Sequence, residues 1–596
     1  MAEWNVLGER ISQRAWRDMV RAAHRRKEII AARLTRRDLI TQGLLTAGGY
    51  LVAKRGLSVR GGSWMPTLQA ASPPVSPFVD PLPIMPIKRA LPTLTPEPTQ
   101  VPNLAAGEGR TRPHQGFTQF PPVEFHQLVQ RPAPVKLSPS LPTQQMWGYD
   151  GIVPGPTFVA RYGRPILVRN FNQLPQQNGG FGINSVSTHL HNGHTPSESD
   201  GFPCDFFETG RFYDHHYPNV LAGILSTHPG TGDVNESLST LWYHDHRIDF
   251  TAQNTYKGLV GFYILFNDLD SGDEGTGFRL PSFPEFDIPM VFADKIFDPI
   301  DGTLAFDLFN LDGVLGDTFT VNGKVQPFLE VAPRRYRLRW LNAGPSRFYE
   351  LYLTDQSNPS ASNPFWQISS DGNLLPQPLE TQSVRLSVAE RADVIVDFRP
   401  FAGKSIVLEN RLQQTNGRGP TGVIVPPGRG NPLLRFDVVL PPVADGSRDP
   451  ATISRFHALP PIDPAANVTR TFQFSRTNGQ WTLNGRFMDC SGVRFSVTQN
   501  DSERWLLNGT SNWQHPMHVH LEEHRILSRG GLAPPLDERG RKDVTRLQVV
   551  EQVEIFMRFR DWTGRYVMHC HNLVHEDHAM MVRFDVDPRG DSRGTP

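Results

Sequence analysis

The stretch His569-Cys570-His571-Asn572-Leu573-Val574-His575, followed by Met580, decides how this 596-residue chain is interpreted. Two His, one Cys and a weak axial Met are the ligands of a blue-copper electron-transfer site. Neighbouring side chains on a strand point to opposite faces. If Cys570 points to one face, His569 and His571 point to the other, where they can bind further metal. The stretch therefore predicts one strand that joins two metal sites.

Three more histidine clusters lie upstream, at residues 189–191 (HLH), 244–246 (HDH) and 515–520 (HPMHVH). On an extended segment, the two His of His-x-His share a face and can bind one metal or two adjacent metals. A single pair is more often an ordinary surface or core feature, but four such patterns together favour a metal protein. We interpret six histidines outside these clusters as ordinary surface or core residues: His194, His215, His216, His228, His524 and His578.

The chain resembles the multicopper oxidases, most of all bacterial spore-coat laccases and bilirubin oxidases. The resemblance covers roughly residues 75 to 590. It is specific at HLHNG (189–193), WYHDH (242–246), HPMHVH (515–520) and HCHNLVHEDHAM (569–580), and weaker at segments such as FVDPLPIM (78–85) and WGYDGIVPGPT (147–157).

The resemblance implies four copper ions and a complete ligand set. The type 1 copper would be bound by His515, Cys570 and His575, with Met580 as axial ligand, which suggests a moderate potential. The type 2 and type 3 ligands are all histidines: His189 and His518 for type 2, and His191, His244, His246, His520, His569 and His571 for type 3.

The resemblance also implies a laccase-like activity, in which phenols or aromatic amines lose single electrons and O2 is reduced to water. Glu576 and Asp200 match acidic positions that assist oxygen reduction, because a carboxylate can relay protons. The alternative for each is a structural hydrogen bond or a charge that offsets copper. We expect Asp245 to orient ligands.

Two other functions remain open at this point. The first, an alternative to the laccase-like activity, is a metallo-oxidase that oxidises Cu(I), Fe(II) or Mn(II). The 12 Met residues include no Met-rich insert, which disfavours Cu(I), whereas Glu576 and Asp577 beside His575 keep Fe(II) open. A copper-binding export or division-associated protein without oxidase activity is disfavoured by the complete ligand set. The expected partners are O2 and a small reductant, and the expected state is a monomer.

Charge and hydropathy restrict the partners further. The chain holds 60 Lys or Arg and 60 Asp or Glu, and thirteen of the basic residues lie in residues 1–60. The remainder is mildly acidic, which argues against nucleic acid. No internal run of apolar residues is long enough to predict a membrane anchor. Thr35-Arg36-Arg37-Asp38-Leu39-Ile40 resembles a twin-arginine export signal, so we expect a periplasmic or secreted protein. A basic amphipathic helix is the alternative, and both can hold.

Short strand-like runs separated by turns predict an all-β chain, and the resemblance implies three consecutive cupredoxin-like β-sandwich (Greek-key barrel) domains. The expected segments are an export signal and leader (1–71), a Pro-rich extended strap (72–103), domain 1 (104–277), a spacer domain 2 (278–440), a linker (441–464), domain 3 with the type 1 copper (465–590) and a tail (591–596). Cys204 and Cys490 form one disulfide between the first and third domains, or remain two buried free thiols.

Overall fold

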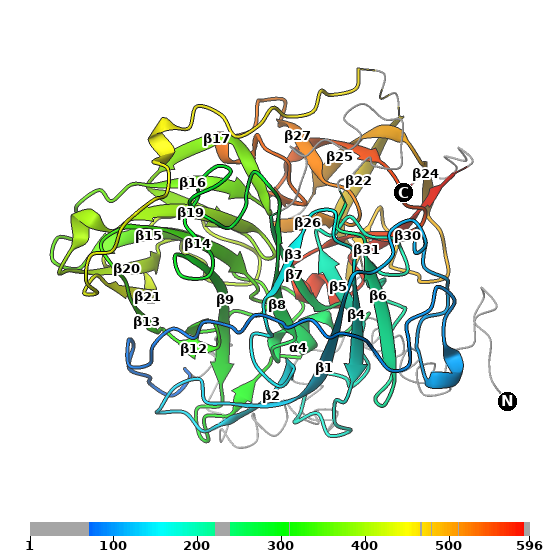
Figure 1. Ribbon diagram of the computed structural model, residues 1–596, viewed down its shortest axis with the longest axis horizontal. Coiled ribbons are helices and arrows are strands. Elements are labelled where there is room, and N and C mark those ends of the chain that lie inside the picture. Colours follow the sequence, from blue (N-terminus) through cyan, green and yellow to red (C-terminus); the bar gives the residue numbers. More distant parts are fainter. Residues whose placement is uncertain are drawn as a thin grey trace, which may run out of the picture.

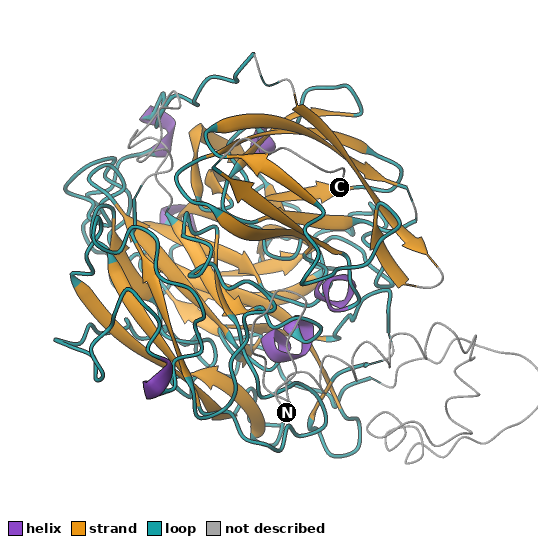
Figure 2. Ribbon diagram, turned by 90° about the vertical axis from the view of Figure 1, so that its right-hand side faces the viewer, coloured by secondary structure: helices purple, strands orange, loops and turns teal. Residues whose placement is uncertain are grey.

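Six β-sheets in three successive pairs make up the computed structural model, which describes residues 71–588 and 596 apart from 221–238, 309, 465, 467, 478–479 and 511. The predicted export signal therefore lies outside the described residues, apart from its last position. Figures 1 and 2 show the sheets packed face to face, each pair formed by one continuous part of the chain. The prediction of three consecutive all-β sandwiches is confirmed.

The first pair consists of two four-stranded sheets, ordered β2-β1-β4-β6 and β3-β8-β7-β5. Its strands are β1 (Glu124–Val135), β2 (Gln144–Tyr149), β3 (Phe158–Arg161), β4 (Ile166–Asn172), β5 (Thr188–His191), β6 (Phe212–Tyr217), β7 (Thr240–Asp245) and β8 (Val260–Phe266). Aromatic and aliphatic side chains from both sheets, among them Trp147, Phe158 and Tyr243, form the core.

The second pair is the largest. An eight-stranded sheet, ordered β12-β11-β9-β14-β19-β16-β17 with β10 on β9, faces a five-stranded sheet ordered β13-β21-β20-β15-β18. The strands are β9 (Asp287–Phe297), β10 (Leu304–Ala305), β11 (Thr318–Val321), β12 (Lys324–Val325), β13 (Phe328–Glu330), β14 (Arg335–Asn342), β15 (Tyr349–Asp355), β16 (Phe365–Ser370), β17 (Asn373–Thr381), β18 (Ser383–Leu386), β19 (Arg391–Asp397), β20 (Ser405–Asn410) and β21 (Asn431–Asp437).

The third pair has two five-stranded sheets, ordered β23-β22-β25-β29-β27 and β24-β31-β30-β26-β28. Its strands are β22 (Val468–Thr477), β23 (Gln480–Leu483), β24 (Phe495–Thr498), β25 (Asp501–Gly509), β26 (His515–Val519), β27 (His524–Arg529), β28 (Val544–Leu547), β29 (Gln552–Phe559), β30 (Gly564–Cys570) and β31 (Met581–Asp587). The few helices are short: α4 (Thr251–Tyr256), α5 (Leu573–Asp577), η1 (Leu104–Ala106), η3 (Arg399–Phe401), η4 (Pro450–Thr452) and η5 (Leu536–Glu538).

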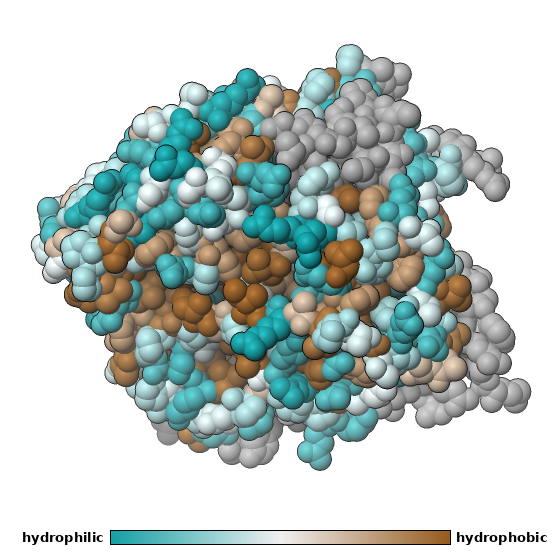
Figure 3. Space-filling model, in the orientation of Figure 1, coloured by the Kyte–Doolittle hydropathy of each residue, from teal (hydrophilic) through white to brown (hydrophobic). Residues whose placement is uncertain are grey.

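The Pro-rich segment 72–103 runs extended across the first and second sandwiches (Figure 1). Its backbone makes isolated bridges to both, for example from Pro81 to Phe328 and from Leu91 to Phe125. Proline cannot donate to a sheet ladder, so the segment lies on the surface instead of entering a sheet. Several of its apolar side chains remain exposed, and Figure 3 shows apolar atoms along the middle of the face that it crosses.

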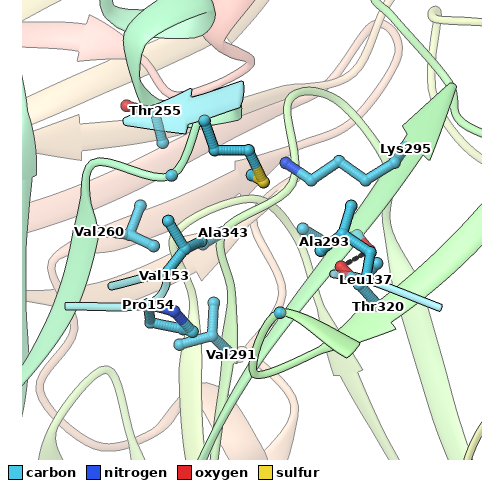
Figure 4. A pocket seen from close by; sticks show the side chains of 13 residues that line it. Leu137, Val153, Pro154, Thr255, Val260, Val291, Ala293, Lys295, Thr320 and Ala343 are labelled. Carbon is cyan, nitrogen blue, oxygen red and sulfur yellow. Dashed lines mark hydrogen bonds between the residues drawn. The ribbon is translucent and has the colours of Figure 1, made fainter. Parts of the chain in front are cut away.

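A small pocket lies between the first two sandwiches (Figure 4). Val153 and Val260 of the first sandwich and Val291 and Ala343 of the second line it. The Lys295 amine at its edge donates to the carbonyl oxygen of Tyr256 (2.6 Å), and burial lowers the pKa of Lys295 to about 7. No candidate metal ligand lines this pocket, so we assign it to packing between the sandwiches.

A disulfide joins Cys204 of the first sandwich to Cys490 of the third, at a sequence separation of 286. Of the two alternatives that the sequence leaves open, the structure has the bonded one. Among the described residues, no helix is long and apolar enough to cross a membrane.

Replacing both cysteines with serine is expected to lower the free energy of unfolding by about 2–5 kcal/mol, because the crosslink restricts the unfolded chain. Chemical denaturation of the wild type with and without a reductant, beside the double variant, measures the effect. Equal stability of all three samples would contradict it.

Candidate metal centres

The register between β26 and β30 decides which side chains meet. The two strands are antiparallel, with Met517 opposite Cys570 and His518 opposite His569. Directly opposed residues point to the same face, so Met517 and Cys570 pack into the core of the third sandwich. His518 and His569 point to the other face, toward the first sandwich. A shift of the pairing by one residue would turn the core-facing side chains outward and the histidines into the core. Burial of apolar side chains on one face therefore stabilises the observed register.

His515, Cys570 and His575 form the first cluster, which is fully buried. The Sγ atom of Cys570 lies 3.5 Å from Nδ1 of each imidazole, and the two Nδ1 atoms are 3.1 Å apart. His575 lies on α5, whose N-terminus is capped by the Asn572 side chain. The three predicted type 1 ligands thus converge through one thiol and two nitrogens, a donor set that suits copper.

Met580 lies beside this cluster. Its backbone N–H donates to the carbonyl oxygen of His575, and its carbonyl oxygen accepts from the N–H of Cys570, both at 3.0 Å. The side chain is buried in the same core as Cys570. The axial role of its sulfur stays a prediction.

The second cluster lies between the first and third sandwiches. His189 and His191 lie on β5, which pairs with β7 so that His189 is opposite His244. The eight imidazoles form overlapping groups whose nitrogens lie within 4.8 Å of one another: His189, His191 and His518; His191, His244 and His571; His246, His520 and His569. The structure therefore brings together every histidine predicted for the type 2 and type 3 coppers.

The hydrogen bonds of these imidazoles test whether metal ions fit. In His189, His244 and His518, Nδ1 faces a backbone carbonyl oxygen, and Nε2 is buried without a partner among the described residues. His191 is reversed, with Nε2 on the Asp543 carboxylate at 3.0 Å and Nδ1 without a partner. A metal-binding imidazole is ordinarily held in this way, with one nitrogen on a protein acceptor and the other free.

The other imidazoles agree with this arrangement. Nε2 of His246 and Nε2 of His520 lie 3.1 and 3.3 Å from Nε2 of His569, and neither nitrogen of His571 has a partner among the described residues. Burial holds the pKa values of most of these imidazoles well below the ordinary range, so they are neutral, as metal binding requires. The residues with this direction are His189, His191, His246, His520, His569 and His571. The residues present fit a group of metal ions.

Asp200 serves two of the imidazoles. Its carboxylate lies 2.7 Å from Nδ1 of His520, and its backbone carbonyl oxygen accepts from Nδ1 of His189. Asp245 acts through its backbone, because its carbonyl oxygen faces His244 while its carboxylate accepts from Ser187 and Asn254. Asp200 is thus a positioning residue in this structure, and its proton-relay role stays a prediction.

Glu576 and Asp577 point inward from α5. Oε2 of Glu576 lies 3.1 Å from Nδ1 of His569, and Oε1 lies 3.5 Å from Nδ1 of His246. Burial raises the pKa of Glu576, and burial followed by the Glu576 charge raises that of Asp577. Both carboxyl groups are buried, so they do not form the exposed acidic site beside His575 that an Fe(II) oxidase would use.

The sequence interpretation missed three residues that contact the clusters. Asp543 bridges His191 and His518 and forms a buried bidentate pair with Arg391. The Trp481 ring lies tilted against the His575 ring, and the carbonyl oxygen of Asp312 accepts from Nε2 of His575. Asp543 lies in a polar loop and Asp312 in the second sandwich, so only a sequence alignment could have marked them.

The histidines interpreted as ordinary have ordinary partners where they are described. His194 contacts Asp561, and His216 contacts the carbonyl oxygen of Phe120; His524 contacts Thr545. His215 and His578 likewise contact protein acceptors or amides, and His228 lies outside the described residues. None of these histidines that the structure describes belongs to a cluster of candidate metal ligands.

Comparison with known proteins gives consistent matches. A family profile described as "Multicopper oxidase" matches residues 461–590. A bilirubin oxidase of Albifimbria verrucaria is 34% identical over 525 residues, covering 86% of this chain and 82% of that protein. A laccase of Bacillus stratosphericus is 32% identical over 519 residues, covering 78% and 94%. The crystal structure of a laccase from Pediococcus acidilactici superposes with a TM-score of 0.67 at 22% identity, covering 87% and 96%, which supports the fold.

Proposed function

The chain belongs to the multicopper oxidase family, and we propose that it is a laccase-like enzyme that oxidises phenols or aromatic amines one electron at a time and reduces O2 to water. The observation that carries this proposal is that β30 joins a His/Cys cluster to a second cluster made of histidines. When bound, four copper ions would supply single-electron oxidation at one centre and four-electron reduction of O2 at the other.

The ligand roles follow from the two clusters. His515, Cys570 and His575, with Met580, would hold the type 1 copper; His189 and His518 would hold the type 2 copper. The other six histidines would hold the type 3 pair: His191, His244, His246, His520, His569 and His571. The support is the convergence of their free nitrogens in a buried space. Cys570 is bonded through the backbone to His569 and His571, so the two centres are linked by the shortest covalent path available.

The protein would contribute rigidity and exclusion of water. Backbone carbonyl oxygens and carboxylates fix the imidazole orientations, so little reorganisation accompanies a change of metal charge. Because all ligands are buried, a reaction at the inner cluster would be shielded from bulk water. The alternative, oxidation of metal ions, is less well supported, because Glu576 and Asp577 are buried and the partly exposed Asp312 carboxylate near His575 is paired with Arg418 and Arg476.

Export through the twin-arginine system remains part of the proposal, carried by the sequence alone. The decisive test of the function as a whole is a copper count and visible spectrum of the holoprotein, followed by O2 consumption with phenols and with metal ions. A protein with one copper per chain, or with no O2 consumption, would contradict the proposal.

Glu576 is proposed to deliver protons for O2 reduction, since its carboxyl lies against His569 and His246. Glu576→Gln is expected to slow reoxidation by O2 roughly 100-fold or more, the scale of a lost general acid. Stopped-flow reoxidation of the dithionite-reduced protein measures this rate, and donor oxidation at the type 1 centre should be unchanged.

The matched control is Glu409→Gln, a buried glutamate of the second sandwich that accepts from Thr354. It should leave reoxidation unchanged. A Glu576→Gln variant that reoxidises at the wild-type rate would remove the proton-delivery role.

A further inference from the structure

The second sandwich holds none of the candidate metal ligands among the residues that the structure describes, yet one of its hairpins reaches the inner cluster. The hairpin joins β16 to β17 through Asp371 and Gly372, which lie between the paired residues Ser370 and Asn373. Both turn residues have a positive φ, 48° for Asp371 and 85° for Gly372, as a two-residue type I′ turn requires. Asp-Gly is a favoured sequence for this turn, so the local sequence specifies the hairpin.

The tip of this hairpin is buried against the first sandwich. The Gly372 carbonyl oxygen accepts from the backbone N–H of Ser239 at 2.8 Å, and a Cβ atom on Gly372 would lie 2.5 Å from the carbonyl oxygen of Thr240. Thr240 begins β7, which carries His244. No side chain fits between the hairpin and β7, so the two backbones are in direct contact.

Asp371 links this hairpin to ligand-bearing segments of both other sandwiches. Its carbonyl oxygen accepts from Nδ2 of Asn192 at 2.8 Å, and Asn192 directly follows His191. Its Oδ2 atom accepts from the backbone N–H of Val544 at 3.0 Å and from that of Asp543 at 3.3 Å. Asp371 is fully buried. One residue of the second sandwich therefore joins the first sandwich to the third.

The segment that Asp371 holds in the third sandwich is the one that orients His518. Val544 lies directly opposite His518 in the pairing of β26 with β28, and the Asp543 carbonyl oxygen faces Nδ1 of His518 at 2.9 Å. The Asp543 carboxylate lies 3.0 Å from Nε2 of His191. A displacement of this segment would therefore move the acceptors of one imidazole from each of the two sandwiches.

A lysine and an arginine hold Asp371 in place. The Lys542 amine lies 2.9 Å from Oδ2, and the backbone N–H of Arg391 donates to Oδ1 at 3.3 Å. The Arg391 guanidinium also donates to the Asp371 carbonyl oxygen at 2.8 Å. Both oxygens of the Asp371 carboxylate thus face donors. An asparagine in its place would turn an NH2 group against one set of these donors, whichever way the amide is oriented.

We propose that Asp371 is a positioning residue for the inner cluster: through Asn192 and the Asp543 segment, it sets where the imidazoles of the first sandwich lie relative to those of the third. The proposal rests on the proposed function, because it concerns the type 2 and type 3 ligands of the same enzyme. The largest effect is expected at the type 2 copper, since its two ligands, His189 and His518, come from different sandwiches. The second sandwich would then act as a template for a site between its two neighbours.

The first test compares the type 2 copper of the copper-loaded wild type and of Asp371→Asn by electron paramagnetic resonance. The variant should show a type 2 signal with altered copper hyperfine splitting, because His189 and His518 lose their relative orientation. The type 1 signal and the blue band should match the wild type. Dialysis should remove the type 2 copper at an about 10-fold lower chelator concentration, the scale of a lost outer partner of a metal-binding imidazole.

Asp294→Asn is the matched control. Asp294 is likewise a buried carboxylate of the second sandwich, paired with Arg347 at 2.9 Å and accepting from the backbone N–H of Gly316 at 2.6 Å. These contacts lie within the second sandwich. The control should lower the free energy of unfolding to a comparable extent and leave both copper signals unchanged, which separates positioning from a general loss of stability.

Asn192→Gly tests the same link from the first sandwich. Glycine adopts the positive φ of Asn192, 67°, without strain, so the variant should fold while losing the bond to Asp371. Its type 2 signal should change in the same direction as in Asp371→Asn, with a smaller loss of copper. Asn500→Gly, at an exposed residue of the third sandwich with the same φ of 67°, should leave the signal unchanged.

The outcomes separate the two hypotheses. A wild type without a type 2 signal would contradict the proposed function and this inference with it. If the wild type has the signal and Asp371→Asn keeps its hyperfine splitting and copper retention, the positioning proposal alone is overturned; where Asp371→Asn does not fold, Asn192→Gly decides in the same way. A type 2 signal altered equally in Asp294→Asn would also overturn it, because the loss of any buried carboxylate would then suffice.

Discussion

Cys570→Ser is expected to abolish both the blue colour and the oxidase turnover of the copper-loaded protein, with one copper ion fewer per chain. The Cys570 thiol is the proposed strong sulfur ligand of the first cluster, and its Sγ atom lies 3.5 Å from both imidazole nitrogens. A serine hydroxyl is neither soft nor readily ionised, so it cannot replace the thiolate as a copper ligand.

The inner cluster should survive this change. His569 and His571 point to the other face of β30 and keep their positions, because the backbone pairing with β26 and β31 does not involve the sulfur. The buried hydroxyl costs about 1–3 kcal/mol if it finds no partner, so the variant should still fold. Copper analysis, the visible spectrum and O2 consumption together measure the outcome.

The serine replacement of Cys204 and Cys490 is the natural control, because it removes the other two cysteines and should leave the blue band intact. A Cys570→Ser protein that stayed blue and active would show that the sulfur of β30 is not a copper ligand, and the whole interpretation of that strand would fail.

Asp543→Ala is expected to empty the inner cluster while leaving the type 1 colour in place. The Asp543 carboxylate holds His191 at 3.0 Å, and its backbone carbonyl oxygen faces His518 at 2.9 Å. Loss of a carboxylate that orients a metal-binding imidazole typically lowers metal affinity about 10–100-fold. Copper occupancy should therefore fall selectively at the type 2 and type 3 sites.

Stability should fall in the same variant. The carboxylate forms a bidentate pair with Arg391 at 2.9 and 2.6 Å, and both groups are buried. Removing one partner leaves a buried charge, which costs about 3–5 kcal/mol. Denaturation of the copper-loaded and copper-free proteins would measure both contributions.

Asp287→Ala separates the two effects. Asp287 forms a similarly buried bidentate pair with Arg339, at 2.7 and 2.6 Å, but contacts no candidate ligand. It should lower stability to a comparable extent and leave the copper content unchanged. If Asp543→Ala behaves like Asp287→Ala in copper content, Asp543 has no role in holding the cluster.

Much of the site could be predicted from the sequence, because the candidate ligands lie in short, local motifs. The ligands are concentrated in short motifs, and the alternation of a strand already separates Cys570 from His569 and His571. Likewise the all-β prediction needed only short strand-like runs and turns, whereas the three cupredoxin-like sandwiches were implied by the resemblance. The inward direction of Glu576 and Asp577 was not readable, because it depends on how α5 packs against α4.

The sequence by itself determined the donor atoms, their order and the all-β class, since periodicity and ligand chemistry are local properties of the chain. Only the tertiary structure decided which carbonyl oxygens and carboxylates hold each imidazole, that Cys204 meets Cys490, and that Trp481 and Asp312 cover His575. These contacts join residues up to several hundred positions apart. They depend on how one sandwich is oriented on another, and no local pattern specifies that orientation.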